Sequence, residues 1–161
     1  MKRKYTAAGY SGYARAALER VPGLCLGTDV MVGFPGETDA DFEETFRFVE
    51  GLDFSYFHVF VYSERRGTAS AALPDKVAPV LARERSLRLK ALGRAKKHAF
   101  YERFRGASGR VLCEPLKAGR WGGFTENYVA VSLASGENLA GKTVDVRLLR
   151  RSGERMLAER A

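Results

Sequence analysis

The sequence predicts an α/β segment followed by a small all-β module. In the first part, helical patterns alternate with apolar strands over short connections, which is typical of parallel βα units. In the last part, short apolar runs alternate with glycine-rich turns, as in small barrels and sandwiches. The flexible run GASG, residues 106–109, separates the two patterns, so we expect domains at residues 1–105 and 106–161.

The first part is expected to contain two strands, each preceded by a helix. Residues 7–20 predict a helix, and residues 24–32 predict a strand that is buried on both faces. Thr38 is a favourable N-cap for a second helix, and residues 54–62 predict a second strand. Two such strands are too few to form a stable barrel or open sheet by themselves.

The predicted second helix begins with acidic residues and buries one stripe. Asp39 and Asp41 lie in its first turn, where the helix dipole favours negative charge. Phe42, Phe46 and Val49 recur at helical spacing and are expected to face the core.

A long loop over residues 63–79 leads to the longest predicted helix, residues 80–105. One side of that helix carries Leu89, Leu92, Ala95 and Ala99. The strands expected after it cover residues 110–116, 124–133, 143–149 and 155–159. Phe124 and Tyr128 would then share one face of a single strand, with at least one of them in the core.

The positive charge of the chain is concentrated in one segment. The formal net charge is +8, yet residues 1–82 carry nine basic and eleven acidic side chains. Residues 83–105 carry nine basic and two acidic side chains, and residues 106–161 carry nine and six. This asymmetry indicates a polyanionic partner contacted from the C-terminal half. The alternative is a solvated helix face that only aids solubility.

The residue types exclude several function classes. Cys25 and Cys113 are far apart and lack metal-ligand spacing, so we expect reduced core cysteines in a cytoplasmic protein and no metal site. No apolar run is long enough to cross a membrane. His58 and His98 have no partners for a nucleophilic triad, and His58 is expected to be a core residue.

The segment TDVMVGFPGET, residues 28–38, is the strongest candidate for a ligand site. It runs from a strand through a Gly-Pro-Gly turn into a helix, and ligands of parallel α/β proteins bind at the carboxyl ends of strands. The alternative is that Gly33, Pro35 and Gly36 only shape a tight turn. No phosphate-binding loop is present, because the lysine and hydroxyl residue of that motif are missing.

Several motifs together resemble a known enzyme family. They are MKRKYT, TDVMVGFPGET, DFEETFRFVE and SYFHVFVYSERRGTASAALPDKV, followed by GFTENYVAVSL and NLAGKTVDVRLL. In this order they are similar to the C-terminal half of the radical S-adenosylmethionine tRNA methylthiotransferases. The resemblance covers nearly the whole chain and implies a partial TIM-like βα barrel followed by a TRAM module, which is an OB-like β-barrel. FTENY and HVFVYSERRGT resemble the threonylcarbamoyladenosine-type enzymes more than the isopentenyladenosine type.

The resemblance implies a reaction and its cofactors. Enzymes of this family add a methylthio group to C2 of N6-threonylcarbamoyladenosine at position 37 of tRNA, using S-adenosylmethionine and [4Fe–4S] clusters. Three cysteines hold the cluster that cleaves S-adenosylmethionine, and this chain has no CxxxCxxC motif. We therefore expect a C-terminal fragment that starts at an internal methionine, is inactive alone and has the N-terminal part of the enzyme as its partner.

By the same resemblance, S-adenosylmethionine would lie against two strand ends and one N-terminal arginine. These residues are Gly33, Pro35, Gly36 and Glu37 of the turn, Val61, Tyr62 and Ser63 after the second strand, and Arg3. The alternative is that the turn residues only shape the backbone and that Tyr62 only packs.

The TRAM-like part has basic and aromatic residues suited to binding tRNA. They lie in a short glycine-rich hairpin and are Lys117, Arg120, Trp121, Phe124, Asn127 and Tyr128. Trp121, next to two glycines, is expected to be the most exposed of the three rings. A competing hypothesis is a stand-alone RNA-binding protein without catalytic activity, and a third is a degenerate fragment that aggregates through unpaired strands.

Overall fold

The computed structural model describes residues 4–161 and divides the chain into two compact units. The first unit ends at Lys96 and the second begins at Lys97. This boundary falls inside a long helix, before the expected domain boundary at Gly106. Arg3, one of the proposed cofactor contacts, lies outside the described residues.

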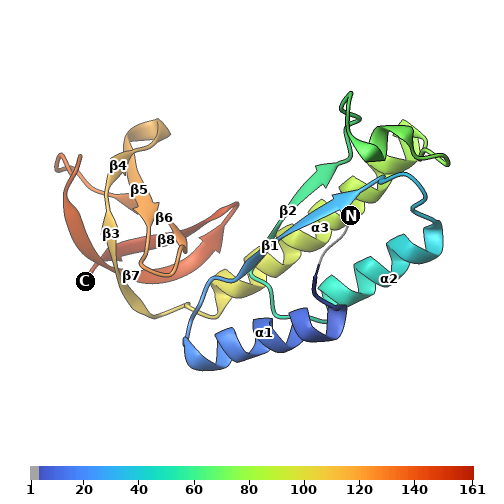
Figure 1. The fold of residues 1–161 in the computed structure, drawn as a ribbon. Helices are drawn as coiled ribbons and strands as arrows, with labels where there is room; N and C mark the ends of the chain where they lie inside the picture. Colours follow the sequence, from blue (N-terminus) through green and yellow to red (C-terminus); the bar gives the residue numbers. More distant parts are fainter. Residues whose placement is uncertain (1–3) are drawn as a thin grey trace. The chain divides into compact units, whose positions relative to one another are not determined.

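The first unit is a parallel strand pair packed against helices (Figure 1). Strand β1, Gly27–Val32, pairs in parallel with β2, Tyr56–Val61. The helices are α1, Ala7–Arg20, α2, Asp39–Glu50, and α3, Pro79–Glu102, with a 3-10 turn η1, Ala69–Ala72, before α3. The alternating helices and strands and their parallel pairing confirm the predicted α/β pattern.

Local chemistry fixes the ends of α2. The Thr38 hydroxyl accepts a hydrogen bond from the Asp41 backbone N–H at 3.2 Å, and the Asp41 carboxylate accepts one from the Thr38 N–H at 2.9 Å. This reciprocal capping box satisfies two backbone donors at the helix start. Gly51 caps the other end. The predicted N-cap is therefore confirmed.

The core of the first unit covers one face of the strand pair. Val30 and Val32 of β1 pack with Phe42 and Val49 of α2 and with Leu89 of α3. A second cluster joins Ala14 of α1 to Leu52 and Phe54, ahead of β2. The helices thus supply one layer against the sheet.

The opposite face of the strand pair stays exposed, so the prediction of a strand buried on both faces was wrong. Met31 and Phe60 are direct neighbours across the strands and are 39% and 50% exposed. His58 is exposed on the same face, so its predicted place in the core was wrong too. Among residues 4–161, only the helices on the other face supply a packing layer.

The buried stripe of α3 matches the predicted one at Leu89 but not at Ala95 and Ala99, which are exposed. Ala82 and Arg85 are buried instead. The packing of α3 against α2 and the strands selects this face, which includes a buried arginine that an apolar pattern does not mark.

The second unit is a six-stranded sheet that curls into a half-closed barrel (Figure 1). Its strands are β3, Ser108–Leu112; β4, Glu114–Pro115; β5, Arg120–Phe124; β6, Ala130–Ala134; β7, Thr143–Ser152; and β8, Arg155–Arg160. Their order is β3-β7-β8-β6-β5-β4, and a 3-10 turn η2, Lys117–Gly119, precedes β5. The all-β prediction for this part is confirmed.

Close approach of β5 to β3 shows how far the sheet curls. A Cβ added to Gly123 would lie 2.2 Å from the Leu112 carbonyl oxygen, so only glycine lets the two backbones come this close. The interior is closely packed with apolar side chains, all at most 2% exposed. They include Val111, Val129, Val131, Leu133, Leu139, Val146, Leu148 and Met156.

The prediction of one strand over residues 124–133 was wrong. β5 ends at Phe124, and a tight turn separates it from β6. The Thr125 hydroxyl accepts a hydrogen bond from the Val129 N–H at 3.0 Å, and Tyr128 adopts a φ of 60°. A side chain that bonds a nearby backbone group competes with the strand ladder, which explains the break. The predicted strand over 110–116 is likewise two strands, β3 and β4.

Candidate functional site

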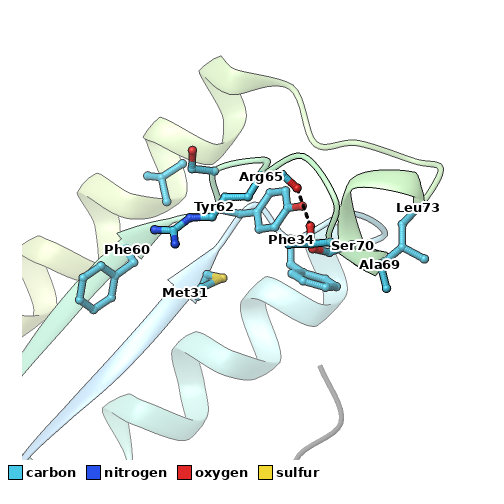
Figure 2. Close-up of a pocket in the computed structure, with 11 residues that line it drawn as sticks. Met31, Phe34, Phe60, Tyr62, Arg65, Ala69, Ser70 and Leu73 are labelled. Atoms are coloured by element: carbon cyan, nitrogen blue, oxygen red, sulfur yellow. Dashed lines mark hydrogen bonds between the residues drawn. The ribbon is translucent and has the colours of Figure 1, made fainter.

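A hollow of ≈ 860 Å³ lies at the carboxyl ends of β1 and β2. Figure 2 shows side chains from both strand ends and from the η1 loop around it. Its lining is mostly apolar and includes Met31, Phe34, Phe60 and Leu73. Such a position is the common ligand site of parallel α/β folds.

Tyr62 supplies the most notable polar group of this hollow. Its ring packs edge-on against Phe34, with ring centroids 5.2 Å apart. Its backbone N–H donates to the Val32 carbonyl at 2.8 Å, so the pairing of the strands continues beyond β2. The hydroxyl oxygen is buried and has no hydrogen-bond partner among the described residues. A buried hydroxyl without a partner favours a ligand that would bond to it.

The Gly-Pro-Gly turn lies next to the hollow. Two of its residues have positive φ angles, which glycine adopts more easily than other residues. Gly33 has a φ of 77° and Gly36 a φ of 85°. A Cβ on Gly33 would lie 2.7 Å from the Cβ of Ala82 on α3, so this glycine also permits close helix packing. The Gly36 N–H donates to the Asp75 carbonyl at 2.9 Å, which fastens the loop after β2 to the turn.

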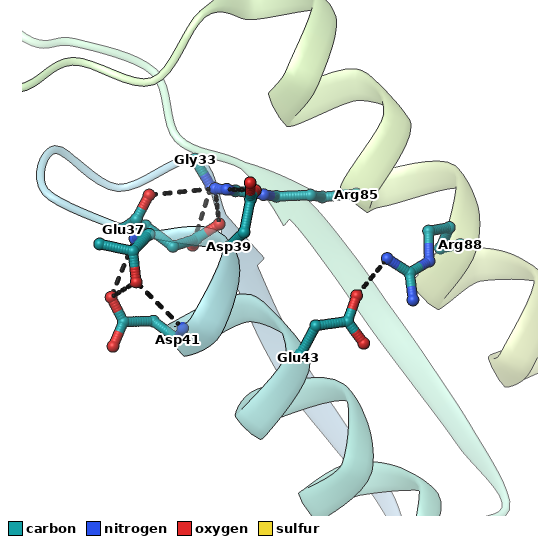
Figure 3. Close-up of polar contacts among 8 residues, drawn as sticks. Gly33, Glu37, Asp39, Asp41, Glu43, Arg85 and Arg88 are labelled. Carbon is teal, nitrogen blue, oxygen red and sulfur yellow. Dashed lines mark hydrogen bonds and ion pairs between the residues drawn. The ribbon is translucent and has the colours of Figure 1, made fainter.

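Glu37 is oriented toward the helix side of the turn and bonds to Arg85 of α3. Its carboxylate accepts a hydrogen bond from the Gly33 N–H at 3.0 Å and forms an ion pair with Arg85 at 2.6 Å. Arg85 also pairs with Asp39 at 2.5 Å, so one cation joins the turn, the start of α2 and α3 (Figure 3). The Arg85 side chain is 3% exposed, whereas that of Asp39 is 84% exposed.

The two carboxylates compensate the buried positive charge of Arg85. Burial opposes its positive charge, but the hydrogen bonds and charges of Asp39 and Glu37 outweigh burial, so the pKa of Arg85 is raised. Arginine stays protonated in proteins, so removal of a partner would leave a buried charge uncompensated.

The predicted cofactor residues therefore fall into two groups. Val61, Tyr62 and Ser63 line the hollow. Four other residues lie in the adjoining turn outside the lining, and they are Gly33, Pro35, Gly36 and Glu37. The sequence analysis did not predict that Met31, Phe60 and Arg65 line the hollow. The alternation of side chains along each strand could have placed Met31 and Phe60 on this face.

The described residues offer no metal centre of the kind an iron–sulfur cluster needs. Among residues 4–161, no group of three or more His, Cys, Asp or Glu side chains is arranged so that it could hold a metal ion. Cys25 is half-buried, and Cys113 is buried in the second unit, where burial raises the pKa of its thiol. Two separated thiols do not fit a cluster held by three cysteines.

A second candidate site is the turn between β5 and β6. Phe124 and Tyr128 are 53% and 68% exposed, and their ring centroids lie 6.3 Å apart. The prediction that one of them belongs to the core was wrong, because the turn places both rings outside the barrel. Trp121, expected to be the most exposed ring, is half-buried within β5.

The polar side chains of this hairpin differ in whether they are already hydrogen-bonded within the unit or are free to contact a ligand. Arg120 is tied to β6 by hydrogen bonds to the Ser132 hydroxyl at 2.7 Å and the Ser132 carbonyl at 3.1 Å. Asn127 accepts a hydrogen bond from Thr125 at 2.6 Å within the turn. Lys117 is exposed in η2. The exposed cation and the exposed ring pair are thus the groups that a ligand can reach.

Glu126 links the turn to β3. Its carboxylate accepts hydrogen bonds from the backbone N–H and the Nε of Arg110, both at 3.1 Å. Hydrogen bonds from backbone groups and from Arg110 lower the pKa of Glu126. The only acidic side chain of the turn at residues 125–128 is therefore paired with a cation.

Comparison with known proteins finds relatives that are similar over nearly the whole chain. It is 34% identical over 93% of its length to the threonylcarbamoyladenosine tRNA methylthiotransferase of Bacillus subtilis. It is 37% identical over 92% of its length to the tRNA-2-methylthio-N(6)-dimethylallyladenosine synthase of Chromobacterium violaceum, and 36% identical over 91% to a threonylcarbamoyladenosine enzyme of Aquifex aeolicus. The chain matches a C-terminal part of the tRNA methylthiotransferases. It spans 34% of the length of each of these three relatives.

These methylthiotransferase relatives confirm the family predicted from the motifs. They include both the threonylcarbamoyladenosine and the dimethylallyladenosine types at similar identity. No family model matches the chain. In the described part of the chain, no helix is long and apolar enough to span a membrane.

Proposed function

We propose that the chain is the C-terminal part of a radical S-adenosylmethionine tRNA methylthiotransferase. In this proposal the first unit is a part of the TIM-like barrel and the second is a TRAM module, with the N-terminal part of the enzyme supplying the cluster cysteines. The observation that carries the proposal is the hollow at the carboxyl ends of β1 and β2, where a cofactor can bind. The similarity of nearly the whole chain to tRNA methylthiotransferases supports it.

The hollow suits the adenosine half of S-adenosylmethionine. Apolar walls from Met31, Phe34 and Phe60 would pack against a flat base, and the unpartnered Tyr62 hydroxyl would bond to a polar edge or ribose oxygen. S-adenosylmethionine supplies the methyl group and, with a reduced cluster, the radical chemistry of this family. The residues of this chain bind and orient the cofactor, while the Glu37–Arg85 pair holds the turn.

The three methionines of the chain allow a direct test of the pocket. In a chain labelled with ¹³C-methyl methionine, S-adenosylmethionine should shift the Met31 signal and leave that of Met156, which is buried in the second unit. Tyr62→Phe should weaken the response, whereas Tyr13→Phe, on the exposed surface of α1, should not. An unchanged Met31 signal at millimolar ligand would remove the pocket from the proposal.

The exposed ring pair of the second unit is the proposed contact to tRNA bases. Phe124 and Tyr128 can stack on unpaired bases, and Lys117 can contact phosphates. Phe124→Ala with Tyr128→Ala should weaken tRNA binding at least about fivefold, because stacking contributes roughly 1–3 kcal/mol per base. Tyr5→Ala with Tyr13→Ala removes two exposed rings of the first unit and is the control. Equal losses in both variants would contradict the assignment.

We propose N6-threonylcarbamoyladenosine at position 37 of tRNA as the substrate, on the basis of the FTENY and HVFVYSERRGT motifs, and a cytoplasmic location with tRNA. Deletion of the gene followed by mass spectrometry of tRNA nucleosides tests this assignment. Loss of the methylthio group from the threonylcarbamoyl nucleoside is expected. Loss from the dimethylallyl nucleoside would contradict the substrate.

A stand-alone RNA-binding protein without catalysis is the second candidate function. It is favoured by the contrast between the closely packed second unit and the open sheet face of the first. In the same deletion strain, unchanged methylthio nucleosides together with tRNA binding by the purified chain would support this candidate over the enzyme.

A further inference from the structure

A bulge in β7 places two arginines on the same outer face of the sheet. Leu148 is opposite Ala158 and Arg150 is opposite Leu157, so Leu149 is an extra residue in β7. In a regular strand, residues three apart point to opposite faces. Because of the bulge, Arg147 and Arg150 lie opposite Glu159 and Leu157, which are two apart in β8 and therefore share a face.

A third arginine joins them from the segment before β3. The Gly106 N–H donates to the Leu148 carbonyl at 2.7 Å, which fixes this segment beside β7. Arg105 then donates through Nε to the Leu149 carbonyl at 3.1 Å, next to the bulge. The two terminal guanidinium nitrogens of Arg105 have no hydrogen-bond or ion-pair partner among the described residues.

These side chains line a groove of ≈ 500 Å³ in the second unit. Arg105, Arg147 and Arg150 contribute three positive charges, against one negative charge from Glu159. Leu149, which is 39% exposed, and half-buried Leu157 form its apolar wall.

The other arginines of this sheet region have structural partners, in contrast to those of the groove. Arg151 pairs with Glu102 at 3.7 Å, Arg155 donates to the Val131 carbonyl at 3.0 Å, and Arg160 pairs with Glu137 at 3.0 Å. The side chains of Arg147 and Arg150 make no hydrogen bond or ion pair within residues 4–161. Their charges remain available to an external anion.

We propose that Arg105, Arg147 and Arg150 form a phosphate-binding groove that contacts the tRNA backbone. Guanidinium groups bind phosphate through two parallel hydrogen bonds, and the groove has no aromatic ring for reading bases. The groove lies on β7 and β8, whereas the stacking pair lies in the β5–β6 turn, so the two would contact different parts of the RNA. This inference rests on the proposed binding of tRNA.

The salt dependence of tRNA binding tests the groove. In titrations of labelled tRNA with the whole chain, Arg147→Ala with Arg150→Ala should weaken binding about tenfold at low salt. The slope of log affinity against log salt should fall by about 1.4 to 1.8, since each lost phosphate contact removes roughly 0.7 to 0.9. Arg15→Ala with Arg20→Ala removes the same charge from the exposed surface of α1 and should leave the slope unchanged.

Each other outcome overturns the groove. An unchanged slope in the variant Arg147→Ala with Arg150→Ala, called the β7 variant, shows that these arginines do not contact phosphates. An equal change in the control Arg15→Ala with Arg20→Ala shows that they contribute only bulk charge. Poly-glutamate binding as tightly as tRNA and with the same loss in the variant shows an acidic polypeptide site instead. If the ring-pair variant loses binding and the β7 variant does not, the groove fails while the proposed function stands. If the unaltered chain does not bind tRNA, both fail.

Discussion

The two units differ in how completely they bury their sheets. In the second unit, the six strands curl so that β5 meets β3, and side chains such as Leu133 and Val146 are at most 1% exposed. In the first unit, two parallel strands are covered on one face, while Met31 and Phe60 remain exposed on the other. A curled, mainly antiparallel sheet can enclose its own core, whereas a parallel pair needs layers on both faces.

This difference explains where each unit places its candidate site. The second unit buries a large apolar interior, and the ligand-binding groups that we propose for it lie on a turn and at a bulge. The first unit has its hollow on the same side as the open sheet face, since Met31 and Phe60 belong to both. In our proposal, S-adenosylmethionine binds in that hollow and the N-terminal part of the enzyme supplies the cluster cysteines.

The largest expected effects come from equal truncations in the two cores. Leu89→Ala in the first unit and Leu133→Ala in the second should each cost about 2–5 kcal/mol, because each removes a side chain at most 1% exposed. In urea unfolding, Trp121 fluorescence reports the second unit and the Met31 methyl signal the first. We expect each substitution to shift mainly the probe of its own unit. Equal shifts at both probes would mean that the units unfold as one.

Removal of the buried cation of the first unit should come next in size. Arg85→Met leaves the Glu37 carboxylate, which is 14% exposed, without its ion pair, and should cost about 2–3 kcal/mol. Arg88→Met is the matched control on the same helix. The side chains of Arg88 and Glu43, which form its ion pair, are 43% and 37% exposed, so we expect a clearly smaller loss than for Arg85→Met. If thermal unfolding showed equal losses of stability for the two variants, burial of the Arg85 ion pair would make no difference to its contribution.

A methyl group at the closure point tests how tightly the second unit curls. Gly123→Ala must push β5 from the Leu112 carbonyl and should cost about 1–3 kcal/mol in Trp121-detected unfolding. Gly136→Ala is the control, because a Cβ there meets no atom within 4 Å. If Gly123→Ala were as stable as the control, the close contact between β3 and β5 would be wrong.

The smallest effect is expected at the N-cap of α2. Thr38→Ala should cost about 1 kcal/mol. Hydrogen bonds from Thr38 lower the pKa of Asp41, so its contribution is present above the ordinary carboxyl pKa and is lost as pH falls through the lowered value. In Thr38→Ala, NMR titration should show the Asp41 pKa moving back up. An unchanged Asp41 pKa would show that the cap does not set it.

Much of the local structure follows from neighbouring residues and could be predicted. The start of α2 depends on Thr38 and Asp41, and its end on Gly51, all close in sequence. The order of helices and strands follows from apolar spacing, and the position of the hollow follows from the rule for strand ends. The family followed from motifs spread along the chain, and relatives of that family confirm it.

Contacts between distant residues were decided only by the tertiary structure. Arg85 meets Glu37 48 residues away, so no local pattern marks it as the cation that holds the turn. The ring pair became exposed because a side-chain bond of Thr125 ended β5, and Arg147 and Arg150 came to share a face because β8 pairs around a bulge. The sequence by itself determined the order of helices and strands in the first unit and the resemblance to the family, since those depend on neighbours and motifs. Which side chains face a ligand depends on packing and strand register, and these exist only in the folded chain.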